Sequence, residues 1–555
     1  MDVRNRDQFM DEKHRRRTGA FFTPKKWVDE AHKMMDAELG PNWREEYVVW
    51  DASAGTANLT RDYRFKELYL STLEQTDVDI ILKSGFNPGA VVFQFDFLND
   101  PIEDSIIGGP SKLPEGLKKA LEENRPIVFL NNPPYGTSSD YRALFNNIHK
   151  EKIDHTEISK KMKEERINGS SNLMAQFIWG ICNIPKIFKL SVFSICTFSQ
   201  LSILTIPTYK KIRIDYLNNL NYKSGFIFPS TDFIGNSANW PVLFSIFSEK
   251  NNLPRENNQT IKVNIKNTNT LKTIHNNDYT ESEFEWVSLK NITSKKQGLS
   301  LSSALTVNEK YDINIPVNSF GFYSIMNTVV KESKNGIFSS GVGSIFTDRF
   351  CISPENFEKC ISSVSSRMVL NDAQWYEMND IFLKPDVNNI LYQQWVNDSI
   401  IISIFNLRQS QISSLRQVTY HNSLWDLENH FFYLSNQEMR DLANQHNNTI
   451  LYQDTFKYPN DRFVYNKLQS LQGQFSPDAQ AVLDKAIELT RLSFPYRKDA
   501  DPKFHLNAWD AGWYQIRMGI LKEHFPKEYS EFRELLLVLR KRMAPLVYEL
   551  GFLKR

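Results

Sequence analysis

Short β-rich runs alternate with amphipathic or polar segments through the first half of the chain. This alternation is typical of an α/β fold, in which helices cover both faces of a mostly parallel sheet. Seven runs fit one doubly wound, mostly parallel, Rossmann-like sheet; they cover residues 47–52, 68–73, 90–97, 126–130, 190–198, 225–228 and 242–247. Ligands of such sheets bind beyond the carboxyl ends of the strands, so the residues after each run are the first candidates for a site.

The chain has 555 residues, too many for a single hydrophobic core. We expect the α/β domain to cover residues 1–265, followed by a connector over 266–330, of which 287–307 is rich in Ser, Thr and Lys. Residues 331–474 mix Gly, Ser and aromatics with short strand-like and helical pieces, and we expect an α+β domain there. Periodicity after residue 475 predicts a helical C-terminal region over 475–555.

The overall charge is nearly balanced, with 66 Lys and Arg against 65 Asp and Glu, so it neither supports nor excludes binding to nucleic acid. Basic residues cluster at 13–17 and at Lys160, Lys161, Lys163 and Arg166, although such a charge run is usually just a solvated face. The four cysteines lack CxxC spacing and nearby histidine pairs, which predicts no disulfide and no metal site. Without a signal peptide or a membrane-spanning apolar run, we expect a cytoplasmic protein.

The first predicted strand ends in an acid and a turn of small residues, Asp51-Ala52-Ser53-Ala54-Gly55. Small side chains let the backbone approach a nucleoside-bearing ligand closely, while the acid lies near its charged groups. An ordinary tight strand-to-helix turn is the alternative.

The next two predicted strands also end in acids. Glu74 follows the second strand, where an acid commonly accepts hydrogen bonds from both ribose hydroxyls; Asp77 is a competing candidate. Asp96 and Phe97 end the third strand, where a carboxylate can accept from an adenine amino group and an aromatic ring can pack on the base. Each signal is weak alone, but three successive acidic strand ends predict a nucleoside pocket.

The fourth predicted strand leads into Asn132-Pro133-Pro134-Tyr135. Such a tetrapeptide occurs by chance in roughly one chain of this length in several hundred. The two prolines fix φ and lack N–H groups, so the segment is rigid and presents carbonyl oxygens.

An exocyclic amine has two N–H donors and a lone pair that is delocalised into its ring. The Asn132 side-chain oxygen and the Pro133 carbonyl could hold both donors and draw the nitrogen toward tetrahedral geometry. Its lone pair would then point at an electrophile, and Tyr135 would stack on the base.

With this segment the chain resembles the gamma-class N6-adenine DNA methyltransferases, in which cofactor motifs precede a catalytic NPPY and a target-recognition domain follows. The resemblance covers about residues 18–250 and includes TGAFFTP at 18–24, similar to the N-terminal cofactor motif of the family. It implies that residues 1–265 transfer a methyl group from S-adenosylmethionine to N6 of an adenine flipped out of the duplex. Residues 331–474 would then recognise the target.

The resemblance also implies roles for individual residues. Thr23 would contact the methionine part of the cofactor, Asp51 and Ser53 its amino-acid end, Glu74 the ribose, and Asp96 the adenine. The expected cofactor-binding residues are Thr23, Asp51, Ser53, Glu74, Asp96, Phe97, Asn132 and Pro134. The expected catalytic residues are Asn132, Pro133, Pro134 and Tyr135.

The chain departs from the family pattern in two places. The first motif usually reads Asp-Pro-x-x-Gly-x-Gly, but Ala52 replaces the proline and Ala57 the second glycine. Ala57 adds one methyl group, which we expect to fit if its φ is negative. The aromatic residue that touches the flipped base is also open, because Phe228 and Phe233 are both candidates and either can be a core residue.

The expected partner is double-stranded DNA, bound by a monomer, with any restriction endonuclease or other defence subunit on a separate chain. Methylation of cytosine N4, of RNA or of a protein glutamine is the alternative activity. An inactive DNA-binding subunit is the alternative from another class.

Overall fold

The computed structural model describes most of the 555-residue chain. The described residues are 22–103, 110–136, 156–233, 239–249, 261–279, 320–325, 337–339, 348–370, 374–378, 380–405, 418–420, 423–425, 429–447, 462–501, 504, 506 and 511–553. The basic run at 13–17 lies outside them. The chain divides into two compact units: unit 1 is Met1–Ser282 with Gln374–Asp380, and unit 2 is Glu283–Ala373 with Ile381–Arg555.

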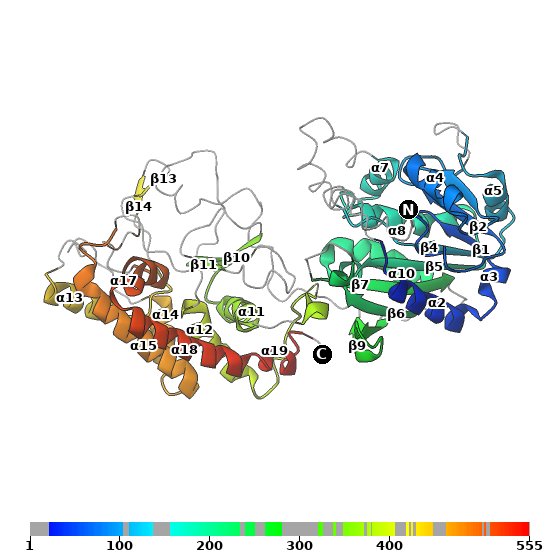
Figure 1. Ribbon diagram of the computed structural model, residues 1–555. Helices are drawn as coiled ribbons and strands as arrows, with labels where there is room; N and C mark the ends of the chain where they lie inside the picture. Colours follow the sequence, from blue (N-terminus) through cyan, green and yellow to red (C-terminus); the bar gives the residue numbers. More distant parts are fainter. Residues whose placement is uncertain are drawn as a thin grey trace. The chain divides into compact units, whose positions relative to one another are not determined.

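Unit 1 is built on one large mixed sheet (Figure 1). Its strands are β1 (Val48–Asp51), β2 (Leu68–Thr72), β3 (Val91–Gln94), β4 (Ile127–Asn131), β5 (Phe193–Gln200), β6 (Leu220–Pro229), β7 (Pro241–Glu249), β8 (Ile261–Lys266) and β9 (Thr273–Tyr279). Their order is β3-β2-β1-β4-β5-β7-β6-β8-β9. The predicted count of seven is therefore wrong. All seven predicted runs form strands, and β8 and β9 extend the sheet beyond residue 265.

The first five strands in space form the parallel part of the sheet. β1 pairs in parallel with both β2 and β4, and β5 is parallel to β4. β7 is antiparallel to β5 and to β6. Every residue of β1, β2 and β4 is buried, as expected of parallel strands covered on both faces.

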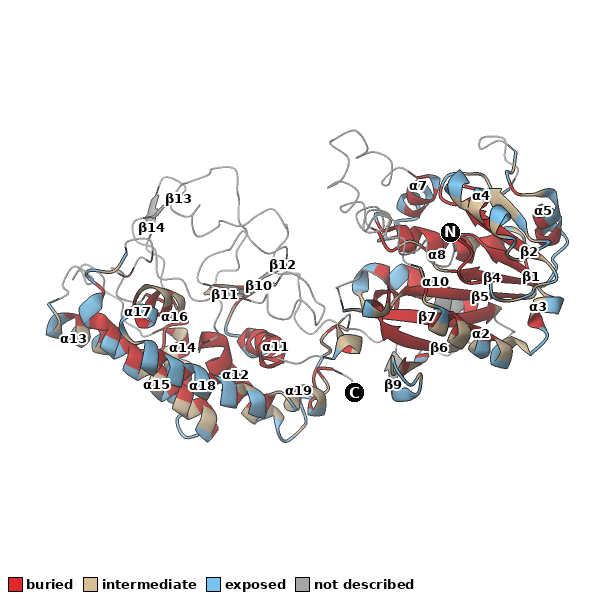
Figure 2. Ribbon diagram, viewed as in Figure 1, coloured by how far each residue is buried: buried red, intermediate tan, exposed pale blue. Residues whose placement is uncertain are grey.

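The helices of unit 1 are α2 (Lys25–Leu39), α3 (Trp43–Glu46), α4 (Gln75–Ser84), α5 (Glu115–Glu122), α7 (Glu157–Glu164), α8 (Leu173–Ile187), α9 (Ser202–Thr205) and α10 (Lys210–Asn219), with a short 3-10 turn, η3 (Ser230–Asp232). Helix α4 packs on β2 and β3, α8 on β5, and α2 and α10 on β6. Figure 2 shows the central strands β1, β2, β4, β5 and β7 as a buried layer. Helix α8 is apolar on nearly every face, which is typical of a helix inside a protein core.

Unit 2 has its own hydrophobic core, made mainly by helices. These are α11 (Phe357–Val369), α12 (Tyr392–Phe405), α13 (Asn436–Gln445), α14 (Phe463–Ser470), α15 (Pro477–Ser493), α16 (Trp513–Ile516), α17 (Lys522–His524), α18 (Pro526–Met543) and α19 (Leu546–Glu549). Its strands are β10 (Gly321–Ile325), β11 (Ile337–Ser339), β12 (Asp348–Ile352), β13 (Val418–Tyr420) and β14 (Ser423–Trp425). Residues from both predicted regions, 331–474 and 475–555, share this core.

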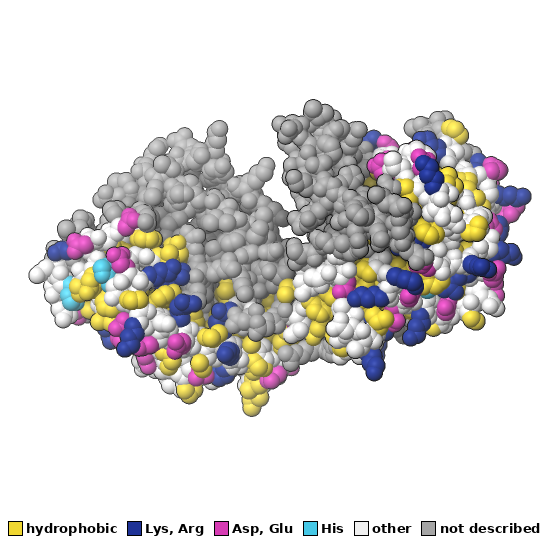
Figure 3. Space-filling model, in the orientation of Figure 1, with side chains coloured by type: hydrophobic (Ala, Val, Ile, Leu, Met, Phe, Trp, Pro, Cys, Tyr) yellow, Lys and Arg dark blue, Asp and Glu magenta, His cyan; other side chains and the backbone are white. Residues whose placement is uncertain are grey.

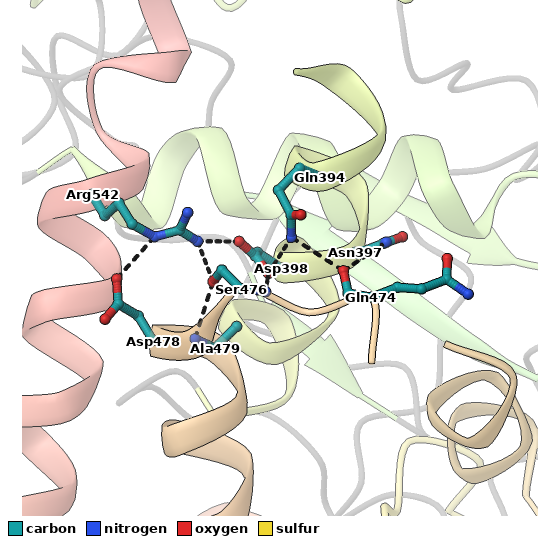
Figure 4. Close-up of polar contacts among 8 residues, drawn as sticks. All are labelled: Gln394, Asn397, Asp398, Gln474, Ser476, Asp478, Ala479 and Arg542. Carbon is teal, nitrogen blue, oxygen red and sulfur yellow. Dashed lines mark hydrogen bonds and ion pairs between the residues drawn. The ribbon is translucent and has the colours of Figure 1, made fainter. Parts of the chain in front are cut away.

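A charged clasp joins three helices of unit 2 (Figure 4). Asp398 of α12 is 1% exposed and accepts hydrogen bonds from the Ser476 backbone N–H (3.0 Å) and the Gln394 amide (3.0 Å). The Arg542 guanidinium of α18 bonds both Asp398 and the Ser476 hydroxyl, and its Nε lies 3.0 Å from Asp478. The clasp therefore ties α12 and α18 to the start of α15.

On the face drawn in Figure 3, described Lys and Arg side chains are interspersed with Asp and Glu. In the basic cluster of α7, Lys160 pairs with Glu157 at 2.6 Å. Among the described residues, the structure contains no helix both long and apolar enough to cross a membrane. The described residues also include no group of three or more His, Cys, Asp or Glu side chains that could hold a metal ion.

Candidate functional site

The topological switch point of the sheet lies between β1 and β4, because the chain leaves β1 toward β2 and β3 on one side and continues from β4 to β5 on the other. Asp51 is the last residue of β1 and Asn131 the last of β4. The Ala52 N–H donates to the Asn131 side-chain oxygen at 2.8 Å. This bond fixes the two turns against each other at the edge where ligands of open α/β sheets bind.

Residues at this point and in the turn after β1 carry buried polar atoms without a hydrogen-bond partner among the described residues. Asp51 is fully buried; its Oδ1 accepts from the Ser53 N–H at 3.0 Å, while Oδ2 accepts nothing. The Asn131 Nδ2 and the Thr56 hydroxyl are likewise buried and have no hydrogen-bond partner among the described residues. Each buried orphan costs roughly 1–3 kcal/mol, and native proteins keep few of them. A set of three around one strand end indicates a place for a polar ligand.

The protonation of Asp51 reflects the same lack of partners. Burial raises the pKa of Asp51 to about 7, and hydrogen bonding from the Ser53 backbone and side chain offsets only part of this effect. A cationic group beside Oδ2 would restore the ionised carboxylate.

The turn after β1 contains two residues in the left-handed region, Gly55 (φ +51°) and Ala57 (φ +62°). The condition under which we expected the Ala57 methyl group to fit, a negative φ, is therefore not met. Ala57 is fully buried, and its N–H donates to the Ala54 carbonyl at 2.8 Å. The turn is thus held in a conformation that costs a residue with a Cβ about 1–2 kcal/mol. This strain explains why glycine suits the position.

The side chain of Asn132, which follows β4 directly, is held at both ends. Its Nδ2 donates to the Thr23 hydroxyl at 2.9 Å, and its Oδ1 accepts from the Tyr135 hydroxyl at 2.8 Å. Thr23 and Tyr135 are each 5% exposed. Burial raises the pKa of Tyr135, so the phenol stays protonated and donates. Pro133 is buried and Pro134 is half-buried.

An aromatic group packs against Tyr135. The Trp240 ring meets it edge-on, with centroids 5.3 Å apart, and the Phe233 ring lies 6.2 Å away. Phe228, the other candidate, is fully buried and stacks on Trp27 at 4.4 Å. Phe233 is therefore the candidate that adjoins the tetrapeptide.

Trp240 was missed by the reasoning from sequence. It is half-buried and immediately precedes β7, whose first residues lie at the same edge of the sheet because β7 is antiparallel to β5. Its backbone is fixed to Ser230 by two hydrogen bonds, of 2.8 and 3.0 Å. A tryptophan two residues before the predicted strand at 242–247 was the available sequence signal.

The remaining predicted residues lie at the ends of β2 and β3. Glu74 is exposed at the start of α4. Asp96 accepts from the Leu98 N–H (3.1 Å) and the Asn99 side chain (2.8 Å). Phe97 is 3% exposed and stacks on Phe177 at 4.9 Å, inside the core. The structure thus brings Thr23, Asn132 and Tyr135 into direct contact. The roles of the acids at β2 and β3 stay predictions.

Only the comparison with solved structures finds proteins similar to this chain. No family model matches the chain, and no curated protein matches it. Similar solved structures include a Listeria monocytogenes protein assigned to the class I S-adenosylmethionine-dependent methyltransferases (12% identity, TM-score 0.29), the DrdV–DNA complex (12%, 0.36) and the type I restriction-modification methyltransferase subunit of Streptococcus thermophilus (15%, 0.29).

These alignments cover 44%, 59% and 46% of this chain and 65%, 37% and 49% of the other chains, in the same order. Similarity at this level does not show an activity or a substrate for this chain.

Proposed function

We propose that this chain transfers the methyl group of S-adenosylmethionine to the exocyclic N6 amine of an adenine in double-stranded DNA. The observation that carries the proposal is the Asn132 amide, which stands at the carboxyl end of β4 beside a turn with orphaned buried polar atoms. An amide acceptor for an amine therefore adjoins buried polar atoms that a polar ligand could pair with.

The residues at the switch point fit the amino-acid end of S-adenosylmethionine, which carries an ammonium and a carboxylate. The Asp51 Oδ2 suits the ammonium, and the Asn131 Nδ2 donor suits the carboxylate. Glu74 lies between β2, the strand next to β1, and α4, where an acid commonly binds the ribose hydroxyls of a nucleoside. When bound, the cofactor would supply an electrophilic methyl group on its sulfonium.

Asn132 and Pro133 would hold the target amine. The amide oxygen and the proline carbonyl would accept hydrogen bonds from the two N–H groups of the amine. These bonds would draw the lone pair out of the ring and onto the nitrogen. Because an amide oxygen has two lone pairs, one bond from Tyr135 can orient it while another is accepted from a substrate amine. Positioning supplies most of the catalysis in such a displacement.

A base inside a duplex can reach this edge only after it is flipped out of the stack. Trp240, which is half-buried and meets Tyr135 edge-on, offers apolar surface for such a base. Phe233 is 1% exposed and supports this surface by packing against Tyr135 and Trp240. We assign sequence recognition to unit 2, which has a separate core and is not needed to complete the sheet. Arg408, Gln409 and Arg416, whose side chains can read base edges, lie outside the described residues.

Methylation-aware sequencing of DNA from cells that express the chain tests the proposal. The wild type should leave N6-methyladenine in one sequence context, and Asn132→Ala should leave none. Asn183→Ala is the matched control, because Asn183 lies within α8, where its side chain bonds the Trp179 carbonyl. Methylation that persists in Asn132→Ala, or that falls on cytosine N4, would overturn the assignment.

A further inference from the structure

Thr23 lies where it can control the amide of Asn132. It is 5% exposed, precedes the N-cap of α2, and accepts the Asn132 Nδ2–H bond at 2.9 Å, across 109 residues of sequence. A side-chain amide has two orientations, related by a half-turn, that exchange its donor and acceptor ends. An acceptor fixed at the nitrogen end therefore favours the orientation in which the oxygen faces the opposite way.

The start of α2 is itself anchored to the aromatic side of the site. The Trp27 Nε1–H donates to Asp232 at 2.7 Å, and the Lys26 ammonium lies 2.8 Å from the same carboxylate oxygen. Asp232 immediately precedes Phe233, which packs against Tyr135. The residues around Asn132 therefore form a closed ring of contacts, from α2 through η3 and the aromatic side chains back to the tetrapeptide.

We propose that Thr23 is a positioning residue for Asn132, whereas the family resemblance implies a direct contact with the cofactor. The inference rests on the proposed function, because it assigns Thr23 a part in holding the amine acceptor. The hydroxyl holds Nδ2, Tyr135 holds Oδ1, and the amide is fixed before the substrate arrives. Misplacement of a reacting group by about 1 Å can reduce the rate by up to about a hundredfold.

The two roles predict different effects of Thr23→Val, which keeps the shape of the side chain and removes its hydroxyl. A positioning role predicts that kcat for methyl transfer to DNA falls by roughly tenfold to a hundredfold. The Kd for S-adenosylmethionine, measured by calorimetry on the full chain without DNA, should stay within about twofold, since no cofactor contact is lost. Thr23→Ser, which keeps the hydroxyl, should restore kcat.

A second measurement reads the hydrogen bond without any turnover. In protein labelled with ¹⁵N at asparagine, the side-chain NH₂ signal of Asn132 is identified as the one that Asn132→Ala removes. This signal should shift in Thr23→Val and return in Thr23→Ser, with the thermal midpoint of both variants confirming that they fold. If the Kd rises tenfold while kcat is unchanged, or if the signal does not move, the positioning role is wrong. A wild type that binds no cofactor and transfers no methyl group instead refutes the proposed function.

Discussion

Replacement of Asp51 by Asn should stabilise the free protein and weaken the cofactor complex. In the folded chain burial raises the pKa of Asp51 from 3.8 to about 7, so the native state holds this proton more tightly than the unfolded state. The contribution of Asp51 to stability is therefore complete below pH 3.8 and is lost as the pH rises through 7. The full loss is about 4 kcal/mol. Asn has the same shape and no charge to bury, so Asp51→Asn should be the more stable protein at pH 8, by up to that amount.

His32 provides an internal reference with the opposite sign. Burial lowers the pKa of His32 from 6.5 to about 4, so its contribution is complete above pH 6.5 and is lost as the pH falls through 4. The loss is about 3 kcal/mol. The two groups nearly cancel between pH 4.5 and 6.5 in the wild type. In Asp51→Asn only the His32 effect remains, so stability should rise steadily with pH across this window.

Hydrogen–deuterium exchange in peptides that contain β1 and β4 measures the opening free energy of unit 1 by itself. Calorimetry on the same samples gives the Kd for S-adenosylmethionine. The wild-type affinity should increase as the pH rises to about 7 and then level off, because binding favours the ionised carboxylate. Asp51→Asn should bind at least tenfold more weakly. The Asp51→Asn variant could instead be no more stable than the wild type at pH 8, or could keep full affinity for the cofactor. Either result would refute the idea that Oδ2 of Asp51 lacks a partner in the free protein and binds the cofactor ammonium.

Five further substitutions test the strained turn, the unit 2 core and the aromatic group. Ala57→Gly should stabilise unit 1 by up to about 1 kcal/mol in urea unfolding, because relief of the left-handed strain exceeds the loss of one buried methyl; a clear destabilisation would contradict this. Asp398→Ala should destabilise unit 2 by roughly 2–4 kcal/mol, whereas Asp478→Ala should cost below about 1 kcal/mol; equal effects would exclude a buried clasp. Trp240→Ala should lower methyl transfer roughly tenfold at unchanged cofactor affinity, since base stacking contributes about 1–3 kcal/mol per base, and Trp240→Phe should retain most activity; equal rates would exclude stacking.

The parallel part of the sheet could be predicted because buried strands leave continuous apolar runs, as in β1 and β4. The strands β8 and β9 were missed although Ile261, Val263 and Ile265 alternate with more exposed residues. This period of two is short and mixed with Lys and Asn, so the run does not stand out from a polar connector.

The contents of the site were only partly predictable. The position of Asn132 after a strand follows from local sequence, but its bond to Thr23 joins residues that only the tertiary fold brings together. The positive φ of Ala57 contradicts the usual preference of its residue type, because the surrounding turn imposes it. The core of unit 2 depends on contacts between distant helices, which no local pattern records.

The most direct test of the proposed function follows the methyl group itself. Purified chain is incubated with DNA and with S-adenosylmethionine that carries a deuterated methyl group, and the nucleosides are then separated and weighed by mass spectrometry. The label should appear in N6-methyl-2′-deoxyadenosine with the wild type and should be absent with Asn132→Ala. Label in N4-methyl-2′-deoxycytidine, or DNA without label while RNA or protein is labelled, would contradict the assignment of adenine in DNA as the substrate.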